Sequence, residues 1–125
     1  MNKIKKKIIF LVNIDSFFVS HRIQIAEKMI KCGYEVHIAT EFTTYKKTLI
    51  RKGFKTHDIT FNRNSLNFFK AFLCIVQIFF LIIKIKPNIL HAISLKPSIF
   101  GGLVSFVSPV KSIVISITGL GSMFL

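Results

Sequence analysis

Apolar and polar positions alternate along this chain in blocks that predict strands and helices in turn. Residues 6–13, KKIIFLVN, are a short continuous apolar run rich in Ile and Val, which is typical of a strand buried on both faces of a parallel sheet. Apolar residues then recur at helical spacing from Ser20 to about Cys32, with Ser20 as the predicted N-terminal cap. Gly33 follows as the left-handed residue that commonly ends a helix.

The same helix-end pattern occurs twice, 20 residues apart. In KCGYEVHIAT and RKGFKTHDIT, Gly33 aligns with Gly53 and His37 aligns with His57. Each segment predicts the end of a helix, then a glycine, then a strand. Because the pattern does not recur after a further 20 residues, we interpret the repeat as two successive βα units rather than a solenoid. Both histidines fall within strands, where a structural role is favoured over a catalytic one.

Helix and strand patterns continue to alternate through the second half of the chain. They predict a long helix over about 65–85, a strand at NILHAIS, a helix opened by Pro97 and a strand at KSIVISIT. Lys-Pro at 86–87 ends the long helix, since proline lacks the N–H that a helix needs. The expected fold class is therefore α/β, with a Rossmann-like, doubly wound parallel sheet of about five strands.

The long helix has an unusually small polar face. Arg63, Lys70, Gln77 and Lys84 recur every seven residues as one narrow stripe, and nearly every other position is apolar. Such a helix is either packed deeply in the core or laid partly into a membrane surface. A transmembrane span is disfavoured, because the apolar stretch between Lys70 and Lys84 is shorter than the about 20 residues that cross a bilayer.

Charge adds a preference for anionic partners. The formal net charge is +13, and the five acidic residues all lie within the first 58 positions: Asp15, Glu27, Glu35, Glu41 and Asp58. A basic and apolar second half favours phosphate groups, nucleic acid or a lipid surface. Nucleic acid is the weakest of these, since no known binding module is present and the aromatic residues lie on apolar faces.

The cysteines and the N-terminus bear on the compartment. Cys32 and Cys74 stand apart without metal-like spacing, and we expect both to be reduced core residues, as in a cytoplasmic protein. MNKIKKKIIFLV has the basic start of a signal peptide, but its apolar run is short and no small-residue cleavage site follows. A secretory signal is therefore not expected.

Polar residues gather after the predicted strands, at the edge where parallel sheets bind their ligands. These strand ends are Asn13 and Asp15, Thr40 and Glu41, and residues 58–63, 91–96 and 118–121. No GxGxxG, P-loop or GxSxG motif accompanies them, which disfavours a dinucleotide site, a P-loop NTPase and a serine hydrolase. His91 is either a base or phosphate contact, or a hydrogen-bonded structural histidine. The side chains of Arg63 and Lys96 are suited to binding phosphate oxygens. Both residues are equally consistent with ordinary solvated surface charges.

Taken in order, several segments resemble the start of the family 4 retaining glycosyltransferases. They are FLVNIDSFFVSHR, IAEKMIKCGYEVHIAT, DITFNRNSLN, KIKPNILHAISLKPSIFGGL and ISITGLGSMF, which together cover nearly the whole chain. The nearest subgroup is the bacterial transferases that build lipid-linked surface polysaccharides and glycans. The resemblance implies a GT-B enzyme with two Rossmann-like domains. Residues 1–125 would be part of the N-terminal, acceptor-side domain, and the C-terminal donor-binding domain would be absent.

The resemblance also implies a site and partners. The residues that would surround the acceptor are Asp15, His21, Arg22, Arg63, His91, Lys96, Thr118, Gly119 and Gly121, while the catalytic residues are not identified. The implied acceptor is a polyprenyl-diphosphate-linked or similar glycan, and the donor is a nucleotide-sugar held by the missing domain. No metal, other cofactor or nucleic acid is expected. The expected location is cytoplasmic, peripheral on the inner membrane.

Three hypotheses follow for this chain. In the first it is the acceptor-side portion of a hexosyltransferase that is not expected to be active alone. In the second it is a non-catalytic, basic, amphipathic protein that binds an anionic membrane surface. In the third it binds nucleic acid non-specifically, with an affinity that falls steeply with salt.

Overall fold

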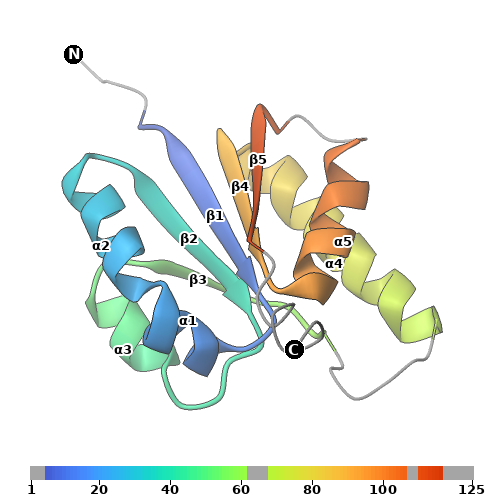
Figure 1. Cartoon of the computed structure of the whole chain (residues 1–125), viewed down its shortest axis with the longest axis horizontal. Coiled ribbons are helices and arrows are strands. Elements are labelled where there is room, and N and C mark those ends of the chain that lie inside the picture. Colours follow the sequence, from blue (N-terminus) through green and yellow to red (C-terminus); the bar gives the residue numbers. More distant parts are fainter. Residues whose placement is uncertain (1–4, 62–67, 107–109, 117–125) are drawn as a thin grey trace, which may run out of the picture.

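The computed structural model describes residues 5–61, 68–106 and 110–116 (Figure 1). Its strands are β1 (Lys7–Val12), β2 (Glu35–Thr40), β3 (Lys55–Asp58), β4 (Ile89–Ile93) and β5 (Ser112–Ser116). Its helices are α1 (Asp15–His21), α2 (Ile23–Lys31), α3 (Lys46–Arg51), α4 (Phe68–Ile85) and α5 (Leu95–Ser105). The predicted alternation of helices and strands is confirmed, with the long helix at α4 and Pro97 in the first turn of α5.

The five strands of the described part form one parallel sheet in the order β3-β2-β1-β4-β5. β1 is central: Phe10 pairs with Ile38 of β2 on one side and with His91 of β4 on the other. Helices α1, α2 and α3 lie on one face of the sheet, and α4 and α5 lie on the other (Figure 1). The predicted doubly wound α/β fold is confirmed. The strand order reverses between β1 and β4, where sheets of this kind leave a crevice beyond the strand ends.

Two hydrophobic clusters, one on each face of the sheet, hold the layers together. Ile9 of β1 packs in a cluster with Ile78 of α4. On the opposite face Phe10 contacts Phe18 of α1, with ring centroids 5.5 Å apart. Neighbouring residues of β1 thus enter different clusters, as the alternation of a strand requires. Burial on both faces explains why the sequence of β1 is continuously apolar.

Gly33 and Gly53 end α2 and α3 in the same way, which explains the repeated pattern in the sequence. Their φ angles of +95° and +98° lie in the left-handed region that glycine adopts without steric cost. After α2, the N–H of Gly33 donates to the carbonyl of Ile30, and that of Tyr34 donates to the carbonyl of Met29, each at 3.0 Å. The same pair of bonds recurs 20 residues later, after α3. Both ends are Schellman motifs, and the predicted helix–glycine–strand units are confirmed.

The single helix predicted from Ser20 to about Cys32 is wrong, because two helices occupy this region. α1 ends at His21, and α2 begins at Ile23. Between them Arg22 has φ −128° and ψ −7°, outside the helical region. The chain therefore turns at Arg22 instead of continuing one helix.

Ser20 is also not an N-terminal cap. Its hydroxyl donates back to the carbonyl of Ser16 at 2.9 Å, within α1, a bond that serine forms inside helices. The segment before Ser20 is helical rather than a loop because Phe18 is buried against Phe10 of β1. This contact joins the helix to the sheet and is not visible in the local periodicity.

The two free cysteines have different environments. Cys74, on the inner side of α4, is buried as predicted, and burial raises the pKa of its thiol to about 11. Cys32 is exposed, so the prediction that it is a core residue is wrong. It is the C-cap residue of α2, just before Gly33, at a helix end that faces solvent.

Among the described residues, α4 is the one helix long and apolar enough to cross a membrane by length and composition, with a mean hydropathy of 2.3. The core helix of a globular domain passes the same test. One side of α4 does face the core, since Cys74, Ile78, Ile82 and Ile85 are buried. Only 22 % of the helix is buried in total, however. α4 is therefore packed against the sheet along one side and exposed along the side that faces away from the sheet.

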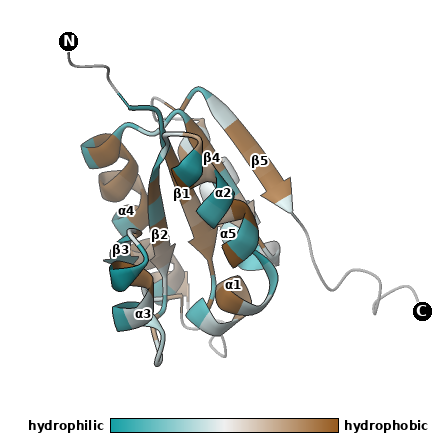
Figure 2. Cartoon of the chain, turned by 90° about the vertical axis from the view of Figure 1, so that its left-hand side faces the viewer, coloured by the Kyte–Doolittle hydropathy of each residue, from teal (hydrophilic) through white to brown (hydrophobic). Residues whose placement is uncertain are grey.

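β5 is the outermost described strand next to β4. Its apolar residues Ile113, Val114 and Ile115 are all partly exposed, and β5 is hydrophobic along most of its length (Figure 2). The strand predicted at KSIVISIT is confirmed over Ser112–Ser116. The last two residues of that prediction lie outside the described residues.

Candidate functional site

The candidate site lies at the carboxyl edge of the sheet, at the switch point between β1 and β4. From this edge β1 leads into α1, and β4 leads into α5 through Ser94, which has a φ of +79°. The N–H of Ser94 donates to the carbonyl of Ser116 at 2.8 Å. This bond ties the end of β4 to the end of β5 and gives the edge a defined shape.

Arg22 and His91 are both predicted from the sequence, and the guanidinium of Arg22 lies near enough for its charge to act on the imidazole. His91 is the middle residue of β4 and not its last. His91 is half-buried in β4, and its ring packs on Phe10 with centroids 5.2 Å apart. Its Nε2 atom lies 2.8 Å from the Oγ atom of Ser116. Burial lowers the pKa of His91 below its usual value, and the nearby Arg22 guanidinium lowers it further. At neutral pH the imidazole is therefore uncharged and acts as a hydrogen-bonding group.

Arg22 supplies a positive charge that acts on that imidazole. It is the N-cap residue of α2, where its side chain forms no capping hydrogen bond, and its Nη1 donates to the carbonyl of His21 at 3.2 Å. A cation at a helix N-terminus opposes the helix dipole and costs some stability. A bound anion would offset that cost by interacting with both the guanidinium and the helix end.

His21 lies next to Arg22 on the exposed side of α1. Its ring stacks on Phe17 with centroids 4.3 Å apart, and its Nδ1 lies 3.3 Å from the carbonyl of Phe17. As the last residue of α1 it does not open a helix, contrary to the sequence-based prediction. Its role in acceptor binding stays a prediction.

Asp15 lies at the edge, but its carboxylate is fully buried and has three internal donors. The Thr43 N–H and the Thr43 hydroxyl donate to it at 2.8 and 2.7 Å, and the Tyr45 N–H donates at 3.1 Å. These bonds fasten the loop after β2 to the start of α1. Asp15 therefore shapes the edge, and its predicted contact with an acceptor stays untested.

Lys96 lies on the other face of the sheet, at the start of α5. Its Nζ donates to the carbonyl of Phe61 at 2.7 Å and lies over the ring of Phe100, 5.9 Å from the centroid. The N–H of Phe61 donates to the Glu41 carboxylate at 2.5 Å. Lys96 and Glu41 thus hold the segment after β3 from two sides.

Four of the predicted site residues lie outside the described residues. They are Arg63, Thr118, Gly119 and Gly121. Of the five that the structure describes, Arg22 lies near enough to His91 to lower its pKa, and His21 adjoins Arg22. Asp15 and Lys96 are held by internal hydrogen bonds. Ser116 joins the site and was not predicted. Its only signal in the sequence is its place at the end of the last predicted strand.

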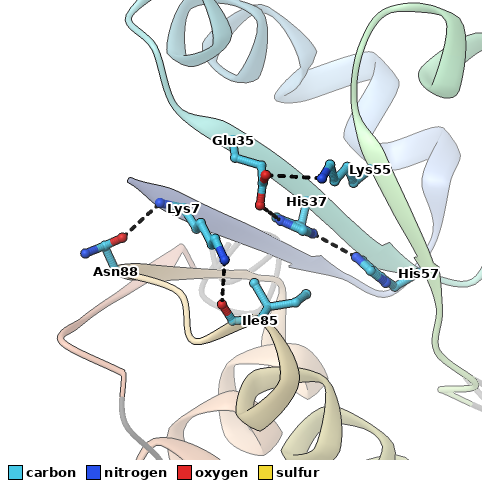
Figure 3. Close-up of polar contacts among 7 residues, drawn as sticks. All are labelled: Lys7, Glu35, His37, Lys55, His57, Ile85 and Asn88. Atoms are coloured by element: carbon cyan, nitrogen blue, oxygen red, sulfur yellow. Dashed lines mark hydrogen bonds and ion pairs between the residues drawn. The ribbon is translucent and has the colours of Figure 1, made fainter. Parts of the chain in front are cut away.

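His37 and His57 form a hydrogen-bonded chain on the face of the sheet that α4 covers (Figure 3). The Oε2 atom of Glu35 lies 2.7 Å from His37 Nε2, and His37 Nδ1 lies 2.8 Å from His57 Nε2. Since the carboxylate accepts, a neutral His37 donates through Nε2 and accepts at Nδ1, so His57 donates through its own Nε2. Lys55 completes the chain by binding the Glu35 carboxylate at 3.1 Å.

These hydrogen bonds between Glu35, His37 and His57 agree with the structural role predicted for both histidines. Burial lowers the pKa of His37, and it lowers the pKa of His57 to about 4. The hydrogen bond from His37 lowers the pKa of the Glu35 carboxyl. The nearby Lys7 is anchored separately, by Asn88 at 2.9 Å and by the Ile85 carbonyl at 3.3 Å (Figure 3). The involvement of Glu35 was not predicted.

Open grooves adjoin these elements. One of about 600 Å³ runs between β3 and α4, and its polar lining includes His57, Gln77 and Lys84. Another, of about 370 Å³, lies beyond the ends of β2 and β3, beside Glu41 and Asp58. Within the described part of the chain, no group of three His, Cys, Asp or Glu side chains is placed to hold a metal ion.

Comparison with known proteins points to one enzyme family. Residues 7–124 match the family described as "Glycosyl transferase 4-like". The fold is similar to that of a glycosyltransferase from Rickettsia africae, with a TM-score of 0.70 and 22 % identity, over 90 % of this chain and 30 % of that one. It is also similar to the C-terminal domain of the PF1911 hydrogenase from Pyrococcus furiosus, with a TM-score of 0.63 and 12 % identity, over 92 % and 95 % of the two chains.

The likenesses to solved structures concern the fold, and the family match covers nearly the whole sequence. No match is found among curated proteins. The chain spans about 30 % of the length of the Rickettsia glycosyltransferase. By the match over residues 7–124, this chain belongs to the glycosyl transferase 4-like family.

Proposed function

We propose that this chain is the acceptor-side portion of a retaining, GT-B-type hexosyltransferase. In the complete enzyme a sugar passes from a nucleotide-sugar to a polyprenyl-diphosphate-linked or similar glycan acceptor, in surface polysaccharide synthesis. Family membership supports the transferase class. The 30 % coverage of the Rickettsia enzyme supports a donor-binding domain outside these residues. On this proposal the chain alone transfers no sugar.

One observation supports the acceptor assignment: the charge of Arg22 acts on the imidazole of His91, which lies in β4 next to β1 at the switch point. A diphosphate presents several anionic oxygens close together, and a guanidinium binds such oxygens with two parallel hydrogen bonds. The neutral imidazole of His91, held by Ser116, adds a hydrogen bond beside that charge. Together they provide one fixed cation and one neutral polar group for the head of a lipid-linked acceptor.

The acceptor also suggests the location. A polyprenyl diphosphate is embedded in lipid, so the enzyme that uses it works at the membrane surface. We place the protein on the cytoplasmic side of the inner membrane, bound peripherally. Its formal charge of +13 favours association with anionic lipid.

Calorimetric titration with geranyl diphosphate tests the acceptor assignment, with geraniol as the uncharged comparison. We expect saturable binding of the diphosphate, weaker by about tenfold or more in Arg22→Gln, because a charge-assisted hydrogen-bond pair is lost. Arg51→Gln, at the far end of α3, is the matched control and should bind as the parent does. Equal affinity of the two variants, or equal binding of geraniol, would reject the assignment.

A second function is favoured by a separate observation. The outer sides of α4 and α5 expose large apolar side chains, and no acidic residue follows Asp58. A non-catalytic protein that binds an anionic membrane would have the same features. It would bind vesicles but show no preference for the diphosphate, so the titration above separates the two functions.

A further inference from the structure

The outward side of α4 carries a continuous apolar ridge. Its members are spaced three or four residues apart, on the side opposite the buried residues of the helix: Phe69, Phe72, Val76, Phe80 and Ile83. Phe69, Phe72 and Phe80 are 68 %, 61 % and 64 % exposed. Because the helix already buries another side against the sheet, this ridge is not needed for the core.

α5 extends the same surface. Ile99, Leu103 and Phe106 lie at helical spacing on its outer side, and Phe106 is 88 % exposed. α4 and α5 pack side by side on the same face of the sheet (Figure 1). A groove of about 340 Å³ between them is almost entirely apolar and is lined by residues that include Phe80 and Leu103. We call this combined surface the α4–α5 face.

α4 is held in place by its inner side. Ile78 and Ile82 are buried in the cluster on the sheet. The side chain of Gln77 accepts a hydrogen bond from the N–H of Thr60 at 3.1 Å, and the carbonyl of Ile85 accepts one from Lys7 at 3.3 Å. A transmembrane α4 would have to break these contacts and expose the sheet beneath. The ridge is therefore suited to lie on a membrane and not to cross it.

Charge decides between the possible occupants of this face. Residues 59–125 contain no Asp or Glu, and Lys70, Lys84 and Lys86 are exposed along and just beyond α4. Apolar aromatic side chains flanked by lysines match the layers of an anionic membrane surface, with acyl chains beneath charged headgroups. A second copy of the chain would place lysines opposite lysines at a net charge of +13 each, which opposes self-association.

We propose that the α4–α5 face docks on an anionic lipid surface, with the axis of α4 parallel to the membrane and the ridge inserted between the headgroups. This deepens the membrane location proposed above by naming the surface that makes the contact. It does not depend on the identity of the acceptor, so loss of diphosphate binding leaves it standing.

A single introduced tryptophan tests the orientation, because the chain contains none of its own. Phe72→Trp places the probe on the ridge. Ile50→Trp places it on α3, across the sheet, at a residue that is 51 % exposed. Each protein is mixed with phosphatidylglycerol vesicles or phosphatidylcholine vesicles, with and without lipids brominated on their acyl chains.

With phosphatidylglycerol we expect the Phe72→Trp emission to shift to the blue and to be quenched by the bromine atoms, while Ile50→Trp changes little. With phosphatidylcholine, both the blue shift and the bromine quenching of Phe72→Trp should be weaker. No response, or an equal response from the two proteins, would overturn the proposal. So would a blue shift of Phe72→Trp without vesicles that grows with protein concentration, because it would show that a second copy covers the face.

Vesicle flotation with paired variants separates the apolar and the charged contributions. Phe72→Ser with Phe80→Ser should weaken binding by about tenfold or more, whereas Ile25→Ser with Ile50→Ser, exposed on the opposite face, should not. Lys70→Glu with Lys84→Glu should weaken binding to phosphatidylglycerol alone, and Lys28→Glu with Lys31→Glu on α2 is the charge-matched control. If either double variant of the α4–α5 face lost no more vesicle binding than its control on the opposite face, docking through this face would be contradicted.

Discussion

The Nε2 atom of His91 lies 2.8 Å from the Oγ atom of Ser116, although the two residues are 25 positions apart in the chain. The contact links β4 to the outer strand β5, beside the switch point between β1 and β4. It holds an imidazole that is uncharged at neutral pH near the cation of Arg22. A site of this kind presents one positive charge and one neutral hydrogen-bonding group toward the strand ends.

The pKa of His91 should respond to Arg22. Burial is the larger cause of its lowered pKa and the guanidinium is the second, so Arg22→Gln should raise the pKa of His91 part of the way toward its usual value. Arg51→Gln should leave it unchanged. A histidine titration followed by NMR measures both, and an unchanged pKa in Arg22→Gln would mean that the guanidinium lies too far from the imidazole to act on it.

Asp15→Asn should destabilise the fold. The carboxylate accepts from two N–H groups and one hydroxyl while fully buried. An amide in its place turns an N–H donor toward another donor, at a cost of about 2 kcal/mol. Asp58→Asn removes an exposed pair with Lys46 and should cost less than about 1 kcal/mol. Urea unfolding compares them, and equal losses would mean that Asp15 does not anchor the loop after β2.

Stability should fall on acidification between about pH 6.5 and pH 4. The pKa of His57 drops from 6.5 to about 4 on folding. The unfolded state therefore binds more protons than the folded state in this window, and acidification lowers the free energy of unfolding. The stabilisation from neutral His57 is complete above the window and is lost as the pH falls through it. His37 and His91, whose pKa values are also lowered, act in the same direction.

Variants isolate the part due to His57. His57→Gln should flatten the dependence of the free energy of unfolding on pH, measured by urea titration across the window. Gln24→Asn, an exposed substitution that changes no titratable group, should keep the slope of the parent. A slope in His57→Gln as steep as in the parent would argue against the buried histidine chain.

Two adjacent glycines of α5 should respond to alanine in different ways. A Cβ at Gly102 would meet nothing within 4 Å, whereas one at Gly101 would lie 3.3 Å from side-chain atoms of Leu11 and Leu90. Gly102→Ala should therefore stabilise the helix by up to about 1 kcal/mol. Gly101→Ala should be the less stable of the two variants by about 1 kcal/mol or more. Thermal unfolding that ranks them the other way would contradict the packing of α5 on the sheet.

Much of the fold could be predicted from local patterns. The continuous apolar run of β1 reflects burial on both faces, and the repeated glycine motif reflects two identical helix ends at Gly33 and Gly53. Such features depend on residues close together in the sequence. The alternation they produce is sufficient to predict a parallel, doubly wound sheet.

The errors arose where distant residues determine the local structure. α1 forms as a separate helix because Phe18 packs on Phe10 across the layer boundary. The carboxylate of Asp15 is occupied by Thr43, 28 positions away. The partnership of His91 with Ser116 depends on the register of β4 with β5, which no local pattern specifies.

The central claim is that Arg22 and His91 together bind the anionic head of the acceptor. The most direct measurement is an NMR titration of the isotope-labelled chain with geranyl diphosphate, which follows the imidazole of His91 and the guanidinium of Arg22. We predict saturable shifts of both, and loss of the His91 shift in Arg22→Gln but not in Arg51→Gln. Shifts confined to the groove beside His57 and Lys84, or no saturable shift at all, would contradict the claim.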